Sequence, residues 1–236
     1  MAGGLTQRTL GGVYRELLDC YGPQHWWPAE GPFEVMVGAV LTQSTSWHNA
    51  EMAIDRLKAA EVMTPGALRR LPLVQLASLV YPSGYYNAKA RKLQALAVWF
   101  GEAYRDDIVR LSSMETATLR RQLLAVHGIG DETADAIILY AASQPVFVID
   151  AYTRRIFDRL GERSGSFAPI REGDSYPAYQ LLFMENLPRD TALFNEYHAL
   201  LVRHGKDVCC KQPRCSQCCL RGVRCLFSDG SQEERC

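Results

Sequence analysis

LLAVHGIGDETADAIILYAASQPVFVIDAYTRRIF, residues 123–157, carries the strongest pattern in this chain. It predicts a helix, a tight turn at Gly128-Ile129-Gly130, a second helix, and a short apolar run, 146–149, that ends at Asp150. Glycine lets the backbone turn sharply, and the amides left at the start of the following helix suit a phosphate. The segment therefore predicts a helical hairpin with an anion site, followed by one carboxylate.

Helical periodicity extends over most of the chain. The apolar positions follow helical spacing in residues 47–57, in 89–100 with Lys89 at the exposed start, and from about 191 to 204. Thr64-Pro65 predicts a helix start, and Ser112 with Glu115 has the spacing of a capping box. The strand-like run 146–149 is too short to define a sheet, and residues 163–178 are the expected long loop. The predicted fold class is all-α.

Composition narrows the functional class. At 236 residues the chain can bury a sizeable core, and 47% hydrophobic content argues against disorder. The 26 basic and 26 acidic residues cancel, so any affinity for DNA has to come from a local patch. Neither a signal peptide nor a membrane span is evident, so a cytoplasmic protein is expected, nucleoid-associated if bacterial. Eight cysteines in such a protein favour metal ligation over disulfides.

The hairpin and the carboxylate after it resemble the helix-hairpin-helix and Gly/Pro/Asp element (HhH-GPD) of the endonuclease III superfamily of DNA glycosylases. The resemblance covers residues 21–225. It implies a two-lobed fold: a six-helix barrel lobe over residues 24–144, and a second lobe from 1–23 and 145–236. That second lobe carries a C-terminal cluster loop at about 209–225. The DNA cleft is expected between the lobes.

Four cysteines in 17 residues have metal-ligand spacing: Cys209, Cys215, Cys218 and Cys225 give C-x5-C-x2-C-x6-C. Spacing alone fits zinc or a [4Fe–4S] cluster. The family resemblance favours the iron–sulfur cluster, although this loop redistributes one residue relative to the family. The loop would present Lys211 and Arg214 to a phosphate. Of the other cysteines, Cys210 and Cys219 are alternative ligands. Cys20 is expected to be a buried thiol, and Cys236 is expected to lie in a frayed terminus.

Asp150 has two compatible roles. It suits a helix N-cap, and the resemblance assigns it the catalytic aspartate, 18 residues after Glu132 as the family spacing requires. In lyase members of the family the catalytic lysine stands where this chain has Glu132. None of the five lysines is near the hairpin in sequence, so a monofunctional enzyme that uses water is expected. Glu132 is a solvated helix acid, a contact to the base, or a mark of lost catalysis.

Three tryptophans indicate which branch of the family the chain resembles. Trp26 and Trp27 come before the first barrel helix, and Trp47 follows Thr42-Gln43. The pattern resembles the MagIII-type 3-methyladenine glycosylases, in which such aromatics line the pocket for a flipped base. Indoles stack well on electron-poor alkylated purines. By the same resemblance, Gln43 fills the gap left by the flipped base and Tyr85 is the wedge between base pairs. Ordinary packing is the alternative for all five.

The resulting prediction is a monofunctional base excision repair DNA N-glycosylase, acting as a monomer on double-stranded DNA that contains an alkylated purine. Two alternatives stay open. One is a bifunctional glycosylase and lyase for oxidised pyrimidines, against which the missing lysine argues. The other is an iron–sulfur DNA-binding homologue with weak or no turnover, against which Asp150 argues.

Overall fold

The structure is a computed structural model that describes residues 2–164 and 175–222. In this part of the chain every regular element is a helix, which confirms the all-α class. Two compact units divide the chain: residues 27–144 form one, and residues 1–26 with 145–236 form the other. No helix in the described ranges is long and apolar enough to cross a membrane.

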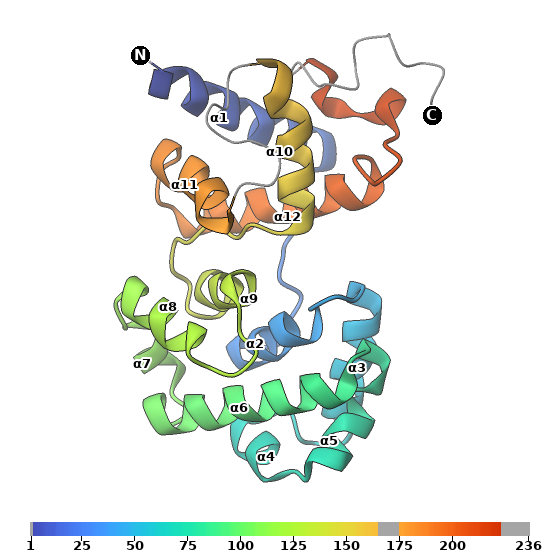
Figure 1. Ribbon diagram of the computed structural model, residues 1–236, viewed down its shortest axis with the longest axis vertical. Coiled ribbons are helices and arrows are strands. Elements are labelled where there is room, and N and C mark those ends of the chain that lie inside the picture. Colours follow the sequence, from blue (N-terminus) through green and yellow to red (C-terminus); the bar gives the residue numbers. More distant parts are fainter. Residues whose placement is uncertain (1, 165–174, 223–236) are drawn as a thin grey trace. The chain divides into compact units, whose positions relative to one another are not determined.

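The unit of residues 27–144 is built on the long helix α6, Tyr86–Tyr104, which packs against α4, α5 and α2 (Figure 1). Helix α2, Pro32–Leu41, is apolar on nearly all sides and is buried along almost its whole length, as such a pattern requires. The other elements are α3 Trp47–Ala59, α4 Pro65–Arg70, α5 Leu73–Leu79, η1 Tyr81–Ser83, α7 Ile108–Ser112, α8 Thr116–Leu124, α9 Asp131–Ala136 and the π-helical η2 Ile137–Ala141.

Local capping explains where several of these helices begin. Thr64 accepts a hydrogen bond from the Ala67 amide with Pro65 in the first turn, so that predicted start is confirmed. The predicted capping box of Ser112 and Glu115 is wrong. Ser112 ends α7, and Glu115 itself caps α8 by accepting from the amides of the next turn. A carboxylate can satisfy those amides directly, so no serine is needed three residues earlier.

Lys89 corrects a second expectation, because its side chain is buried and not exposed. Its ammonium donates to the backbone oxygens of Leu41, at 2.8 Å, and Ser83, at 2.6 Å. Burial, with a smaller contribution from Lys92, lowers the pKa of Lys89 to about 8. The amine therefore closes the end of α2 and the turn before α6, a role that periodicity alone could not reveal.

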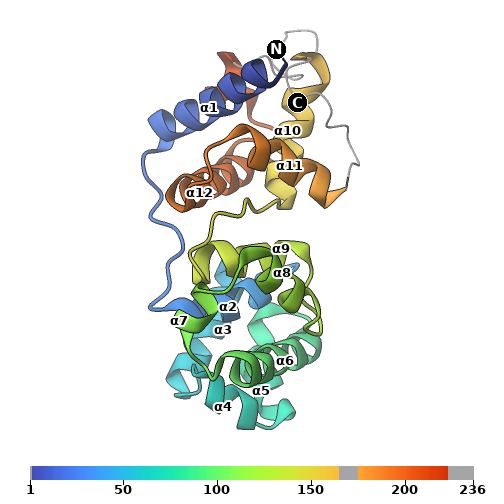
Figure 2. The same cartoon turned by 90° about the vertical axis from the view of Figure 1, so that its left-hand side faces the viewer.

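The other unit joins the two ends of the sequence. Helix α1, Ala2–Tyr21, packs beside α11, Tyr176–Asn186, and α12, Thr191–Asp207, while α10, Ala151–Ser164, packs on α12. The two views of the ribbon show this group of four helices (Figures 1 and 2). Its core is aromatic, with the rings of Phe147 and Phe183 stacked at 3.8 Å. Short helices η3, Cys215–Gln217, and η4, Cys219–Gly222, follow α12.

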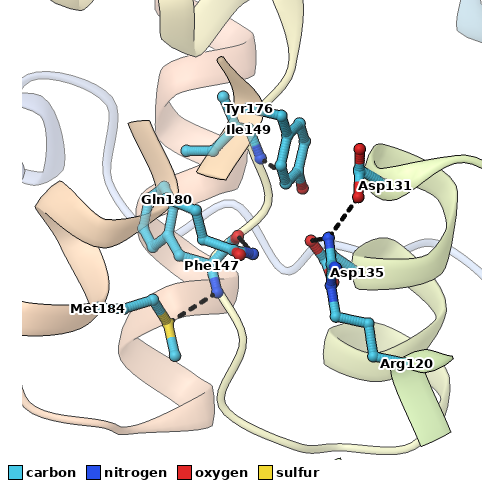
Figure 3. Close-up of polar contacts among 8 residues, drawn as sticks. All are labelled: Arg120, Asp131, Asp135, Phe147, Ile149, Tyr176, Gln180 and Met184. Carbon is cyan, nitrogen blue, oxygen red and sulfur yellow. Dashed lines mark hydrogen bonds and ion pairs between the residues drawn. The ribbon is translucent and has the colours of Figure 1, made fainter. Parts of the chain in front are cut away.

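The strand-like run 146–149 is an extended segment with side-chain partners in place of a neighbouring strand (Figure 3). The Phe147 amide lies 3.3 Å from the Met184 sulfur, and its carbonyl accepts from Gln180 Nε2 at 2.9 Å. The Ile149 amide donates to the Tyr176 hydroxyl. Because α11 supplies these partners, the buried backbone is satisfied without a sheet, and the segment leads directly to Asp150.

Candidate functional site

The hairpin joins α8 to α9 through two glycines with different roles. Gly128 has φ +80°, and a Cβ there would lie 2.4 Å from Lys92 Cγ, so both conformation and space require glycine. Gly130 has φ −101°, a value open to any residue, and nothing lies within 4 Å of a Cβ built on it. The space beside Gly130 is therefore left open by the fold, next to the amides that begin α9.

An ion-pair network holds the two hairpin helices together (Figure 3). Arg120 of α8 donates to Asp135 of α9 at 2.7 and 3.2 Å, and to Asp131 at 2.7 Å. Asp135 is fully buried. The hydrogen bonds between Asp135 and Arg120 are the main cause that raises the pKa of Arg120. A buried carboxylate needs such a partner, so this network fixes the hairpin geometry.

Gln43 is tied to the hairpin through both ends of its amide. Its Oε1 accepts from Lys92 Nζ at 2.6 Å, while Nε2 donates to the Gly128 carbonyl at 3.2 Å and to Thr133 Oγ1 at 2.9 Å. These partners define which way the amide points, since the ammonium can only donate. Lys92, distant in sequence, thus lies beside the hairpin, a proximity that the sequence did not signal.

Two of the three predicted pocket tryptophans meet. The ring centroids of Trp27 and Trp47 lie 5.6 Å apart in an edge arrangement, and Tyr140 of η2 approaches Trp27 at 5.2 Å. Gly38 permits this packing, because a Cβ there would lie 3.1 Å from the Trp27 ring. All three rings are partly exposed. Trp26 is partly exposed too, and it belongs to the other compact unit.

Tyr85 stands at the tip of the turn before α6. Its side chain is 74% exposed, and its backbone is left-handed at φ +46°, following Gly84 at φ +69°. Such a conformation is unfavourable for a bulky residue and marks sites where the chain holds a side chain in a particular position. The exposed ring has the accessibility that a wedge requires.

The two acids of the predicted catalytic pair differ in exposure. Glu132 is exposed in the first turn of α9. Asp150 is 8% exposed, and its Oδ1 accepts from the Thr153 amide at 2.7 Å, which confirms the predicted capping bond at the start of α10. Its Oδ2 lies 3.8 Å from Nε2 of His198, a buried residue of α12 that sequence reasoning missed.

Arginines of α10 organise the beginning of the cysteine loop. Arg155 donates to the carbonyls of Gly205 and Cys209, and Arg159 Nη1 lies 3.1 Å from the Cys209 sulfur. Both of the Arg155 contacts are internal to the protein. Lys211 and Arg214 are exposed, as a phosphate contact requires.

Of the four predicted metal ligands, the structure describes Cys209, Cys215 and Cys218. Cys209 is buried, Cys215 and Cys218 are partly exposed, and Cys225 lies outside the described residues, as does Cys236. Within residues 2–164 and 175–222, no three histidine, cysteine or acidic side chains are grouped as a metal site. Cys20 was expected to be buried, but it is exposed on α1.

Comparison with known proteins agrees with this geometry. The family model for the HhH-GPD superfamily of base excision DNA repair proteins matches residues 37–169. A provisionally named DNA repair glycosylase of Methanocaldococcus jannaschii is 42% identical over 87% of this chain and 91% of its own. Endonuclease III of Sulfolobus acidocaldarius is 27% identical over 80% and 79%.

A solved structure of H. pylori 3-methyladenine DNA glycosylase (MagIII) bound to 1,N6-ethenoadenine has a TM-score of 0.72 and 27% identity. The alignment covers 85% of this chain and 97% of that one. A non-covalent endonuclease III–DNA complex has a TM-score of 0.77 at 22% identity over 93% and 94%, which shows the shared fold. The helical hairpin, the carboxylate after it and these similarities together show that the chain is a base excision repair DNA glycosylase of the HhH-GPD superfamily.

Proposed function

We propose that the protein is a monofunctional DNA N-glycosylase that releases alkylated purines such as 3-methyladenine from double-stranded DNA. The pair of acids supports this proposal most: by resemblance, Asp150 corresponds to the family's catalytic aspartate and Glu132 to the lysine of lyase members, and Asp150 is buried whereas Glu132 is exposed. A carboxylate supports hydrolysis, but a Schiff base needs an amine. We expect the enzyme to act as a monomer on DNA in the cytoplasm or nucleoid.

In this mechanism Asp150 stabilises the positive charge that develops on the sugar as the bond to the base breaks. It also orients or deprotonates the water that attacks the sugar carbon. The cap bond from the Thr153 amide occupies Oδ1 and leaves Oδ2 for this work. Because alkylation already makes the purine a good leaving group, strong protonation of the base is unnecessary.

The partly exposed cluster of Trp27, Trp47 and Tyr140 supports an aromatic pocket for the flipped base. A cationic purine gains about 0.5–2 kcal/mol from an indole face, more than a puckered, non-aromatic pyrimidine does. The similarity to a glycosylase solved with 1,N6-ethenoadenine supports a purine substrate. Glu132 adds attraction for a cation.

Contacts to duplex DNA are assigned to two groups of residues. The amides around Gly128 and Gly130, together with Lys211 and Arg214, bind phosphates, and phosphate contacts set affinity and register. Tyr85 wedges between base pairs, and Gln43 fills the space left by the flipped base. For that, Gln43 has to exchange its contacts with Lys92 and the hairpin for contacts with DNA.

We also propose that Cys209, Cys215, Cys218 and Cys225 hold a [4Fe–4S] cluster, with zinc as the alternative. Four thiolates suit either group, and the Arg159 guanidinium lies 3.1 Å from the Cys209 sulfur. When bound, the cluster supplies structure to the loop and no chemistry to base release.

Base release and strand cleavage, measured separately, test the proposal. Duplexes carrying 1,N6-ethenoadenine, 3-methyladenine or thymine glycol are incubated with purified protein, with and without alkali. We expect purine release without cleavage until alkali is added, and no covalent complex in borohydride. Preferential release of thymine glycol would contradict the proposed substrate, and efficient trapping would contradict the monofunctional mechanism.

Lys92 makes the trapping experiment decisive, because it is the amine observed beside the hairpin. If borohydride traps a complex and Lys92 is the nucleophile, Lys92→Arg should abolish the trapping. Lys58→Arg is the control, since Lys58 forms ion pairs with Glu34 of α2 and with Glu30 just before that helix. Loss of trapping only in Lys92→Arg would favour the bifunctional alternative.

Metal analysis tests the cluster. We expect brown protein with about four irons per chain and broad absorption near ~400 nm. Cys225→Ser should lose the metal, whereas Cys210→Ser should keep it. One zinc in a colourless protein would replace the iron–sulfur assignment.

A further inference from the structure

His198 lies against the candidate catalytic carboxylate. Helix α12 carries this histidine and packs on α10, whose first turn Asp150 caps. Nε2 of His198 is 3.8 Å from Asp150 Oδ2, and the two side chains are 8% and 11% exposed. Helix α12 thus brings the buried imidazole of His198 next to one oxygen of the Asp150 carboxylate.

The two oxygens of Asp150 have different neighbours. Oδ1 accepts from the Thr153 amide at 2.7 Å, and this bond belongs to the helix cap. Oδ2 takes no part in the cap and lies next to His198. Rotation about the bond between Cβ and Cγ of aspartate is broad, so one cap bond leaves the carboxylate plane poorly defined. A second neighbour on the other oxygen defines that plane.

The charge of the imidazole decides what such a neighbour does to the carboxylate. Burial lowers the pKa of His198, and the nearby Asp150 opposes this only in part. At neutral pH the ring is therefore uncharged. A neutral ring can orient a carboxylate without cancelling its charge, whereas a guanidinium in the same place would neutralise it.

We propose that His198 is a positioning residue for base release: the neutral imidazole holds the Asp150 carboxylate with Oδ2 ready for the sugar and leaves its negative charge intact. The inference rests on the proposed function, because it assumes that Asp150 carries the chemistry. The distance of 3.8 Å is longer than a hydrogen bond, and such contacts often tighten when substrate binds.

Two substitutions separate orientation from packing. His198→Leu keeps an apolar side chain in the buried site but removes the nitrogen, whereas His198→Gln keeps an N–H donor near the Nε2 position. With duplex DNA containing 1,N6-ethenoadenine, His198→Leu should lower the single-turnover rate of base release by about 10–100-fold. The dissociation constant for the same duplex should change by less than about threefold, and His198→Gln should recover most of the rate.

The double variant with Asp150→Asn provides the matched control. If His198 acts through Asp150, adding His198→Leu to Asp150→Asn should cause little further loss. Equal loss in the Leu and Gln variants, or additive loss in the double variant, would overturn the positioning role. If the Leu variant does not fold, His198→Asn replaces it, because its shorter amide falls short of the Nε2 position and should restore less activity than Gln.

The same measurements distinguish failure of this inference from failure of the proposed function. Full activity of Asp150→Asn would remove Asp150 from the chemistry, and with it the basis for a positioning histidine. Strong loss in Asp150→Asn combined with an unchanged rate in a folded His198→Leu protein would contradict only the role of His198.

Discussion

Asp135 and Asp150 are both buried aspartates, the first near the end of α9 and the second at the start of α10, yet their surroundings differ in charge. Asp135 is fully enclosed and bonded twice by the Arg120 guanidinium. Asp150 has a helix amide at one oxygen and the uncharged His198 near the other. The charge of Asp135 is neutralised where it lies, whereas the charge of Asp150 is kept. Burial alone therefore does not identify a catalytic carboxylate. Within residues 2–164 and 175–222 a guanidinium contacts Asp135 but not Asp150, and this difference favours Asp150 as the catalytic acid.

The largest effect is expected at Asp135. Arg120→Met leaves that buried carboxylate without its guanidinium, and breaking such a pair by removing one partner costs about 3–5 kcal/mol. Denaturant unfolding followed by circular dichroism measures the loss. The double variant Arg120→Met/Asp135→Leu removes both charges and should recover most of it, because a well-packed apolar pair can replace a buried ion pair.

An exposed pair gives the control for this prediction. Arg110 and Asp107 lie 3.3 Å apart with about half of each side chain exposed. Arg110→Met should change the free energy of unfolding by less than about 1 kcal/mol. If Arg120→Met is as stable as the unmodified protein, the network does not hold the hairpin together.

The next largest effect is expected on turnover at Asp150. Asp150→Asn should reduce the rate of base release about 10²–10³-fold, because one electrostatic stabiliser of the transition state is removed. The free energy of unfolding should hardly change, since asparagine caps helices as well as aspartate does. Kinetics and unfolding of the same preparation measure the two quantities.

Asp190 supplies a matched substitution, because it caps α12 through the Leu193 amide at 2.7 Å and is exposed. Asp190→Asn should change neither turnover nor stability. A similar loss of turnover in both variants would show that capping, and not the retained charge, accounts for the effect at Asp150.

The sequence could predict what depends on neighbours along the chain. The hairpin, the start of the helix at Thr64-Pro65 and the cap at Asp150 each follow from a short motif, and all three were confirmed. The substitution at Glu132 was equally visible, since it needs only a position counted from Gly130. Local motifs therefore gave the helical fold and the candidate catalytic position.

Contacts between distant segments were beyond such reasoning. Lys92 beside the hairpin and His198 beside Asp150 both depend on how helices pack, and no spacing reports that. Lys89 was misread because a lysine at a helix start is ordinarily exposed, whereas here two backbone oxygens converge on its amine. A buried polar residue is recognised only once its partners are known.

Lys89 extends the comparison to a buried charge that is satisfied by carbonyl groups. Its pKa is about 8 in the folded protein against 10.5 in the unfolded chain, so between these values the unfolded chain binds more protons. Stability should therefore rise with pH through this window, by about 1–2 kcal/mol between pH 8 and 10. Urea unfolding of the unmodified protein relative to Lys89→Met isolates this slope from tyrosine titration. Parallel curves for the two proteins would contradict the lowered pKa.

The smallest effects are expected at the hairpin glycines, which repeat the contrast between fold and function. Gly128→Ala should cost about 1–2 kcal/mol, because it places a side chain at φ +80° and against Lys92. Gly130→Ala should leave stability within about 0.5 kcal/mol, since its φ is ordinary and the space beside it is open.

If that open space receives a DNA phosphate, Gly130→Ala should instead weaken duplex binding, because the added methyl group stands between the amides and the phosphate. Unfolding and fluorescence anisotropy with a labelled duplex, performed on both variants, separate the two effects. Salt dependence adds a control: a lost phosphate contact makes binding less sensitive to salt, whereas partial unfolding reduces the active fraction at every salt concentration. Unchanged affinity and salt dependence in Gly130→Ala would show that the space next to α9 is not where the backbone of DNA approaches.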